Sequence, residues 1–237
     1  MMPSFQTGEI VYENPLASEK DVADFVAEGS PVTSFPMQAM RLENAMDPEL
    51  GQAANYLFWC PQKMPADICI EWDFRPIREP GLAMMWFCAD GREGKDLFDP
   101  SLSPRTGDYK QYHSGDINGY HASYFRRKNV QHERTFHTAN LRKSHGFHLV
   151  CQGADPIPSV IDVLESYHIQ IIKCGGHIRF SVNDLTLYEW FDDGEQTGPV
   201  LGDGYIGFRQ MAPLIADYSN LVVRKVRIAP ETEEGNK

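Results

Sequence analysis

The chain has 237 residues, of which 42% are hydrophobic, and its 33 acidic and 22 basic residues give a formal net charge of −11. This length suits one large domain, and the apolar fraction allows a sizeable core. The negative charge argues against binding to DNA, RNA or an anionic membrane surface, because these partners attract basic proteins. No run of about 18 apolar residues occurs, so no transmembrane helix is expected.

The N-terminus has no cationic stretch followed by an apolar run, so no secretory signal is predicted. The cysteines are odd in number, form no C-x-x-C pair and mostly lie in apolar runs; they are Cys60, Cys69, Cys88, Cys151 and Cys174. This pattern predicts reduced, buried thiols in a cytoplasmic protein, and it disfavours a zinc site.

One short helix is predicted near the N-terminus, where Ser18 can cap, Asp21 takes the third helical position and Gly29 can end the helix. Beyond it, short apolar or alternating stretches rich in Ile, Val, Phe, Tyr and Trp predict strands. These strands are expected at 37–43, 55–60, 67–75, 82–89, 109–113, 120–127, 146–151, 167–173, 177–182, 185–191, 204–211 and 218–228.

The clearest hairpins lie in 167–191, where Gly175-Gly176 and Asn183-Asp184 join three strands in sequence. These dipeptides tolerate the positive φ that tight hairpin turns require. About a dozen strands without βαβ alternation predict an all-β protein built from two stacked antiparallel sheets.

We expect a single domain over 1–237, with an ordered core at 8–228 and a frayed acidic tail at 231–237. Two segments rich in Gly, Pro and Asp, 90–108 and 152–163, have no strand or helix period. The first predicts a long ordered loop, and loops of that length inside compact domains are often functional.

Positive charge is concentrated between residues 105 and 150, which hold eight basic residues, three acidic residues and six of the eight histidines. A local cationic patch on an acidic protein suits a small anionic ligand. Solvated surface arginines and histidines at the core edge are the alternative interpretation.

Strand alternation divides the stretch 120–127 into two faces that both carry polar groups. One face would hold His121, Ser123, Phe125 and Arg127, and the other Tyr120, Ala122, Tyr124 and Arg126. A turn at 114–119 would fold the predicted strand 109–113 beside this stretch and bring Tyr112 opposite His121. We therefore expect one polar face to line a cleft.

A histidine and a tyrosine beside arginines suit proton transfer next to a carboxylate, as in β-elimination of a uronic acid. The candidate acid/base residues are Tyr112, His113, His121, Tyr124 and His148. The candidate carboxylate or hydroxyl clamps are Arg126, Arg127, Arg142, Lys143 and Arg209, with Asn118, Asn140 and Gln210 as polar contacts. Glycoside hydrolysis stays open, because Glu71 and Asp73 share a strand face, although the E-x-D-x-x-E pattern is incomplete.

No metal or cofactor is predicted. The pair His145-x-x-His148 would fall on opposite faces of a strand, and Asp116-x-Asn118-Gly119 has only part of a calcium-loop pattern. Neither a G-x-S-x-G motif nor a phosphate-binding glycine loop occurs, which disfavours a hydrolase elbow, an NTPase or a dehydrogenase.

Four long stretches are distinctive: EWDFRPIREPGL (71–82), DLFDPSLSPRTGDYKQYHSGDIN (96–118), NLRKSHGFHLVCQGADP (140–156) and GYIGFRQMAPLIADYSN (204–220). With them the chain resembles the YesU-like family of bacterial proteins, a domain of unknown function, over roughly residues 8–225. This resemblance implies a concanavalin-like jelly-roll sandwich with its ligand cleft on the concave sheet. It also implies a link to systems that degrade pectic and other polysaccharides.

These observations predict a carbohydrate-active enzyme, either a glycoside hydrolase or a lyase, that acts on an acidic, pectin-like oligosaccharide containing uronic acid. A non-catalytic, lectin-like module is the alternative, because the same fold hosts lectins. The sugar, its linkage, the presence of a structural calcium and the oligomeric state are left open.

Overall fold

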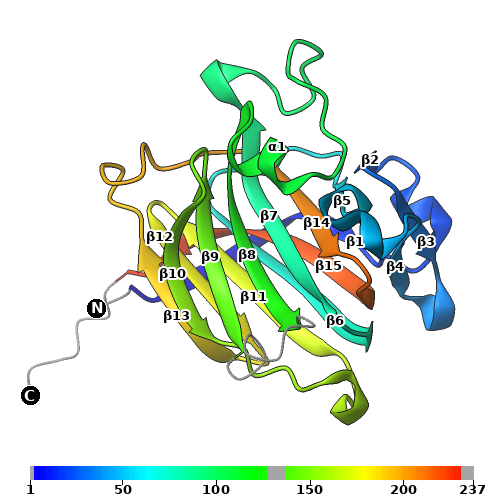
Figure 1. Cartoon of the computed structure of the whole chain (residues 1–237). Coiled ribbons are helices and arrows are strands. Elements are labelled where there is room, and N and C mark those ends of the chain that lie inside the picture. Colours follow the sequence, from blue (N-terminus) through cyan, green and yellow to red (C-terminus); the bar gives the residue numbers. More distant parts are fainter. Residues whose placement is uncertain (1–2, 128–136, 231–237) are drawn as a thin grey trace, which may run out of the picture.

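The computed structural model describes residues 3–127 and 137–230, which form two antiparallel sheets packed face to face (Figure 1). The eight-stranded sheet runs β13 (Leu185–Phe191), β12 (His177–Val182), β11 (Tyr167–Cys174), β6 (Ile68–Arg78), β15 (Ile215–Ile228), β4 (Met40–Asn44) and β3 (Pro31–Ser34), with β1 (Phe5–Asn14) paired to β15. The seven-stranded sheet runs β10 (His148–Ala154), β9 (Thr138–Ser144), β8 (Ile117–Arg127), β7 (Gly81–Gly91), β14 (Tyr205–Met211), β5 (Tyr56–Trp59) and β2 (Val26–Glu28). The predicted all-β sandwich is confirmed.

The helices of the described residues are short. The α-helix α1 spans Tyr109–His113. The 3-10 helices are η1 (Glu19–Val22), η2 (Pro36–Gln38), η3 (Pro48–Ala54), η4 (Arg92–Gly94) and η6 (Val160–Asp162). The helix predicted near the N-terminus is thus a single 3-10 turn, and the chain enters β2 before Gly29.

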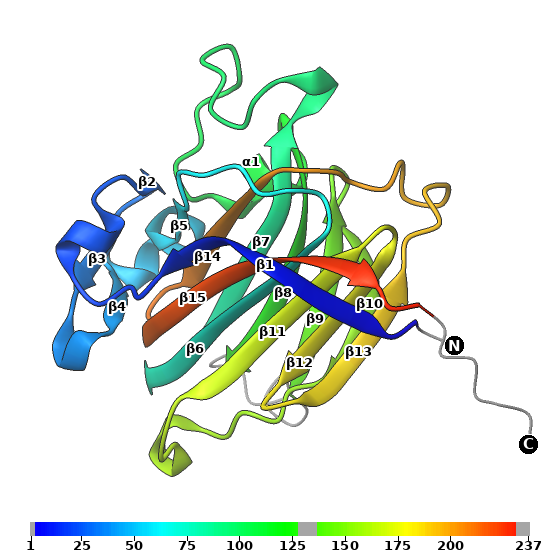
Figure 2. The ribbon, with the colours of Figure 1, turned by 180° about the vertical axis from the view of Figure 1, so that it is seen from behind.

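The core lies between the two sheets and follows from strand alternation. In β6, Ile68, Ile70, Trp72 and Phe74 are buried on the inner face, whereas Glu71 is partly exposed on the outer face. Both predicted hairpins form, and β11, β12 and β13 lie next to one another in the sheet that faces the viewer in Figure 2. Gly175 and Asn183 adopt the positive φ values, 55° and 47°, that these turns demand.

The prediction of a strand at 109–113 is wrong, because this segment is α1. The Asp108 carboxylate accepts a hydrogen bond from the Lys110 N–H (2.9 Å), and Ser114 N–H donates to the Lys110 carbonyl (3.1 Å). Aspartate before a helix satisfies a backbone donor that would otherwise lack a partner. Helical spacing also places Tyr109 and Tyr112 on the same side of α1, where both rings face Arg209.

Four strands were not predicted: β1, β2, β3 and β9. The inward residues Ala139 and Leu141 of β9 do alternate with Asn140 and Arg142, but Lys143 and Ser144 are buried polar residues that obscure the pattern. The predicted tail at 231–237 lies outside the described residues, as do Lys128, His132 and Arg134 of the basic segment.

The predicted loop at 90–108 covers part of the outer face of the seven-stranded sheet. Its Leu97, with Phe98 and Leu102, packs in a second apolar cluster that also contains Trp59 and Trp86 of the sheet. Such a cover leaves only part of this outer face open to a ligand, beside α1.

Candidate functional site

A groove of about 200 Å³ lies on the uncovered part of the outer face of the seven-stranded sheet. It is bounded by α1 on one side and by the β9–β10 turn on another. Its lining residues are Gln52, Leu82, Met84, Tyr109, Ser123, Arg126, Asn140, Arg142, Phe147 and Met211. None of these is acidic. We call this feature the arginine groove.

Two partly exposed guanidinium groups, from Arg126 and Arg142, enter the arginine groove. Arg142 lies over the Phe147 ring at 3.9 Å and donates to the Phe147 carbonyl (3.0 Å). Neither arginine forms an ion pair with any described residue. Both are therefore available to bind an anionic group from solution, in the way arginine binds carboxylates.

A bulge in β8 decides which arginine faces the arginine groove. Phe125 has a φ of 48°, and the register with β7 shifts between Gly81 and Ala83. As a result Tyr124 and Phe125 both point into the core, where their rings contact Phe74 at 4.9 and 5.8 Å. The regular alternation predicted for 120–127 is therefore wrong after Tyr124.

His121 forms a close pair with Tyr109 at the edge of the arginine groove. The Tyr109 hydroxyl lies 2.6 Å from Nε2 of His121, and the His121 ring stacks on Trp86 at 4.2 Å. His121 is only 1% exposed. Burial, reinforced by the positive charges of Arg142 and Arg209, holds the His121 pKa well below its usual value, so the imidazole is neutral at neutral pH.

Arg209 lies beneath Tyr109 and is fully buried. Its guanidinium stands 5.0 Å from the Tyr109 ring and 5.1 Å from the Tyr112 ring, and it donates to the Gly107 carbonyl (2.8 Å). Burial lowers the pKa of Arg209 and raises that of Tyr109 to about 12, although the neighbouring arginine charge acts to lower the Tyr109 pKa. Arg209 thus supports α1 from below and does not reach the groove.

The prediction that Tyr112 lies directly opposite His121 is wrong. The ring of Trp86 contacts both residues, at 5.9 Å from Tyr112 and 4.2 Å from His121. The Tyr112 hydroxyl accepts a hydrogen bond from Gly107 N–H (3.1 Å). Tyr112 is therefore part of the packing that holds the 90–108 loop on the sheet.

Other predicted site residues lie in the core. Tyr124 is fully buried between the sheets, and its hydroxyl accepts a hydrogen bond from the Trp72 indole (3.1 Å). Gln210 donates to the carbonyls of Leu42 and Leu214 and accepts from Tyr218. Neither side chain can reach a ligand on the outer face.

Two predicted clamps are buried in ion pairs. Arg127 pairs with Asp155 (3.0 Å) and also donates to the Ile157 carbonyl. Lys143 pairs with Asp192 and donates to the Gly198 carbonyl, both at 2.6 Å. These charges are already neutralised within the fold, so Arg127 and Lys143 are not free to bind an anion from solution.

Of the remaining predicted residues, only Asn140 lines the arginine groove. Asn140 accepts a hydrogen bond from Gln152 (2.7 Å). His113 packs on Phe147 at 4.3 Å without lining the groove, and burial lowers its pKa. His148 is exposed at the start of β10, and Asn118 lines a separate hollow.

Tyr109 is the residue that sequence reasoning missed. It lines the arginine groove, pairs with His121 and lies above Arg209. The stretch D-Y-K-Q-Y-H contained the signal, because Asp108 is a strong helix cap and a helix would have placed Tyr109 with Tyr112.

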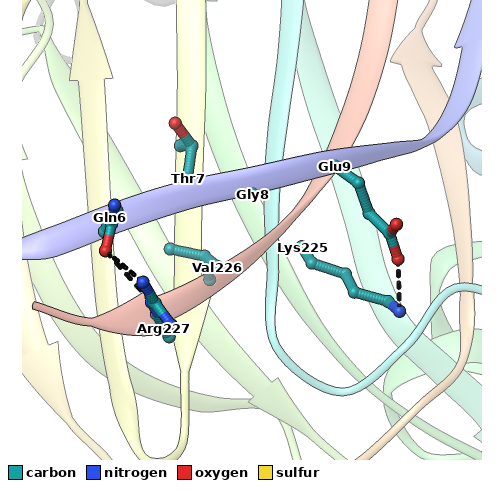
Figure 3. A pocket seen from close by; sticks show the side chains of 7 residues that line it. All are labelled: Gln6, Thr7, Gly8, Glu9, Lys225, Val226 and Arg227. Atoms are coloured by element: carbon teal, nitrogen blue, oxygen red, sulfur yellow. Dashed lines mark hydrogen bonds and ion pairs between the residues drawn. The ribbon is translucent and has the colours of Figure 1, made fainter.

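A larger hollow of about 480 Å³ lies between β1 and β15 (Figure 3). There Glu9 pairs with Lys225 (2.6 Å), and Arg227 donates to Gln6 (2.7 Å), all at exposed positions. Glu9 neutralises Lys225, and Arg227 is bonded to a neutral amide, so among the described residues this surface offers a charged ligand one unpaired guanidinium where the arginine groove offers two.

The acidic pair Glu71 and Asp73 lies on the outer face of the other sheet. His168 stands between them, 3.6 Å from Glu71 and 3.1 Å from Asp73, and Asn220 donates to Asp73 (2.7 Å). These carboxylates are therefore far from Tyr109 and His121 in the layering of the sandwich, and the two sets do not form one site.

Within residues 3–127 and 137–230, no group of three or more His, Cys, Asp and Glu side chains is arranged to hold a metal ion. In the same part of the chain, no helix has the length and apolar character needed to cross a membrane. The five cysteines are free thiols, and four are buried, as predicted.

Comparison with known proteins gives one strong set of relatives. The uncharacterized protein YesU of Bacillus subtilis (strain 168) is 49% identical over 221 residues, which cover 93% of this chain and 98% of YesU. A crystal structure of a protein of unknown function with a galectin-like fold from Bacillus subtilis matches with a TM-score of 0.90. It is 49% identical, and the match covers 94% of this chain and 99% of that one.

More distant structures share the fold alone. The carbohydrate binding module CBM66 from Bacillus subtilis matches with a TM-score of 0.53 at 14% identity, over 85% of this chain and 96% of that one. The β-glucanase of Bacillus licheniformis also has a TM-score of 0.53, at 8% identity, over 93% and 99%. The fold is thus the galectin-like, concanavalin-like sandwich, as the family resemblance implied. Residues 9–223 match the model of the domain of unknown function DUF1961, and the chain belongs to that family.

Proposed function

We propose that the protein binds an acidic oligosaccharide in the arginine groove and cleaves it by β-elimination. The observation that carries this proposal is that Arg126 and Arg142 lie in one groove together with neutral polar side chains. Two guanidinium groups without ion-pair partners among the described residues share one groove with the phenol of Tyr109 and the carboxamide of Asn140. A sugar carboxylate suits the arginines, and sugar hydroxyls suit the neutral polar groups.

Elimination fits this groove better than hydrolysis. Glycosidases generally use two carboxyl groups on either side of the bond that breaks. No Asp or Glu lines the groove among the described residues. In β-elimination a base removes the proton from C5 of the uronic acid, a double bond forms between C4 and C5, and the C4–O bond breaks. The departing oxygen then takes up a proton.

In this proposal Tyr109 transfers these protons, with His121 as its partner. The neutral His121 can accept a hydrogen bond from the Tyr109 hydroxyl across their 2.6 Å separation. Arg126 and Arg142 would hold the carboxylate and stabilise the negative charge that develops on it when C5 loses its proton. In this scheme Arg209 keeps Tyr109 in position and touches no substrate.

A non-catalytic sugar-binding role is the second candidate, and one observation favours it. Burial raises the Tyr109 pKa to about 12, so the phenol stays protonated at neutral pH and is a weak base unless a bound substrate changes its surroundings. The same groove would then recognise an acidic sugar without cleaving it.

One experiment separates these possibilities. The protein is incubated with a panel of uronic-acid oligosaccharides, and ultraviolet absorbance, new reducing ends and calorimetric binding are all measured. Elimination produces an unsaturated product that absorbs in the ultraviolet, whereas hydrolysis produces reducing ends without that absorbance. Binding without either signal supports the non-catalytic role.

Variants test the location of the site. Arg142→Gln and Arg126→Gln should each weaken binding of the acidic sugar, whereas Arg227→Gln, in the hollow of Figure 3, should leave it unchanged. Equal affinity of all three variants and the original protein would rule out the arginine groove as the binding site.

A further inference from the structure

A second hollow, of about 310 Å³, lies beside the arginine groove. The β9–β10 turn separates the two, because Phe147 lines the groove and His145 lines the hollow. The hollow is lined by Arg92, Glu93, Asn118, Lys143, Ser144, His145, Thr197, Gly198, Pro199 and Leu201. It is thus built from the start of β8, the end of β9, η4 and the loop before β14.

Two hydroxyl groups in this hollow have no hydrogen-bond partner among the described residues. They are Oγ of Ser144 and Oγ1 of Thr197, and Ser144 is only 1% exposed. A buried hydroxyl without a partner is unfavourable, so two of them beside one hollow are candidates to hydrogen-bond a ligand. The carboxamide of Asn118, on the same hollow, also makes no side-chain hydrogen bond with a described residue.

The charges around the hollow are largely balanced. The Lys143 ammonium lies 2.6 Å from both the Asp192 carboxylate and the Gly198 carbonyl, so its charge is neutralised within the fold. Arg92 and Glu93 contribute opposite charges at the rim. Besides the exposed His145, the groups left for a ligand are two hydroxyls and a carboxamide, and each of these can both donate and accept hydrogen bonds.

We propose that this hollow is a binding subsite for a neutral sugar unit, with Ser144, Thr197 and Asn118 as its hydrogen-bonding residues. Sugar hydroxyls also donate and accept, and they would satisfy the hydroxyls that the fold leaves without partners. The chemistry contrasts with that of the arginine groove, which selects a carboxylate. The subsite rests on the proposed function only in taking the ligand to be a carbohydrate.

Binding of methyl glycosides of glucose, galactose and mannose tests this subsite, with saturation-transfer NMR and titration at millimolar concentration as the readouts. The key variant is Ser144→Ala combined with Thr197→Val, which removes both hydroxyls and nearly preserves volume. We expect at least one glycoside to bind, and the double variant to weaken it about tenfold, in line with the loss of two hydrogen bonds. Circular dichroism confirms that the double variant is folded.

Arg142→Gln is the matched control, because it alters the groove and leaves the hollow intact. It should weaken the acidic sugar and leave the methyl glycosides unaffected. Absence of binding by every glycoside, or equal binding by the double variant and the original protein, would overturn the subsite. Neither result affects the test of the arginine groove, because that test measures binding of the acidic sugar to the Arg126→Gln and Arg142→Gln variants.

Discussion

The neighbouring residues Arg126 and Arg127 should respond in opposite ways to replacement by alanine. Arg127 is 2% exposed and lies 3.0 Å from Asp155, whose side chain is fully buried. Its guanidinium also stands 4.5 Å from the Phe125 ring. Arg126 is partly exposed and forms no ion pair with the described residues.

These environments set the expected magnitudes. Removing one partner of a buried ion pair costs about 3–5 kcal/mol, because the other charge remains buried without compensation. Arg127→Ala should therefore lower the melting temperature by roughly 6–20 °C in a domain of this size. Arg126→Ala should change the free energy of unfolding by no more than about 0.5 kcal/mol.

Urea denaturation and calorimetric binding of the acidic sugar measure both properties. Arg126→Ala should lose affinity and keep its stability, whereas Arg127→Ala should lose stability. The double variant Arg127→Met/Asp155→Leu should recover most of the lost stability, since well-packed apolar residues can replace a buried ion pair. A stable Arg127→Ala protein that no longer binds sugar would refute the assignment of Arg127 to the fold.

Further predictions concern the Tyr109–His121 pair and the second buried ion pair. If elimination occurs, Tyr109→Phe should reduce turnover by about 10²–10⁴-fold while binding stays within a few-fold, as measured by product absorbance and calorimetry. The pKa of His121 is lower in the folded protein than in the unfolded chain. As the pH falls below about 6.5, the unfolded chain therefore takes up this proton while the folded protein does not, and the free energy of unfolding should decrease. His121→Gln should flatten this slope in denaturant titrations between pH 5 and about 6.5, and unchanged slopes would contradict a neutral buried imidazole. Asp192→Ala should cost about 3–5 kcal/mol because it leaves Lys143 without its carboxylate. The exposed Glu195, whose side chain makes no hydrogen bond or ion pair with a described residue, is the control, and Glu195→Ala should stay within about 0.5 kcal/mol.

Local patterns in the sequence were enough to predict most of the fold. The alternation of Ile68, Ile70, Trp72 and Phe74 with polar residues identifies a strand with one buried face. The turn dipeptide at Gly175 defines a hairpin without any knowledge of the partner sheet. These features depend on neighbours close in the chain, so one sequence suffices to read them.

Local sequence patterns could not predict which residues form the candidate site. Whether Arg126 or Arg127 faces the arginine groove depends on the bulge at Phe125, which shifts the side chains by one position relative to regular alternation. Whether Lys143 is free to bind a ligand depends on Asp192, which is 49 residues further along the chain (192 − 143). The two side chains form their ion pair only when the sandwich is folded.

The sequence by itself determined that this protein is an all-β sandwich with a cationic, aromatic segment between residues 105 and 150. Composition and strand periodicity carry that information. Only the tertiary structure decided which cations remain available, because Asp155 and Asp192 neutralise Arg127 and Lys143, whereas no described acid reaches Arg126 or Arg142. Long-range pairing between charges sets this choice, and no local pattern encodes it.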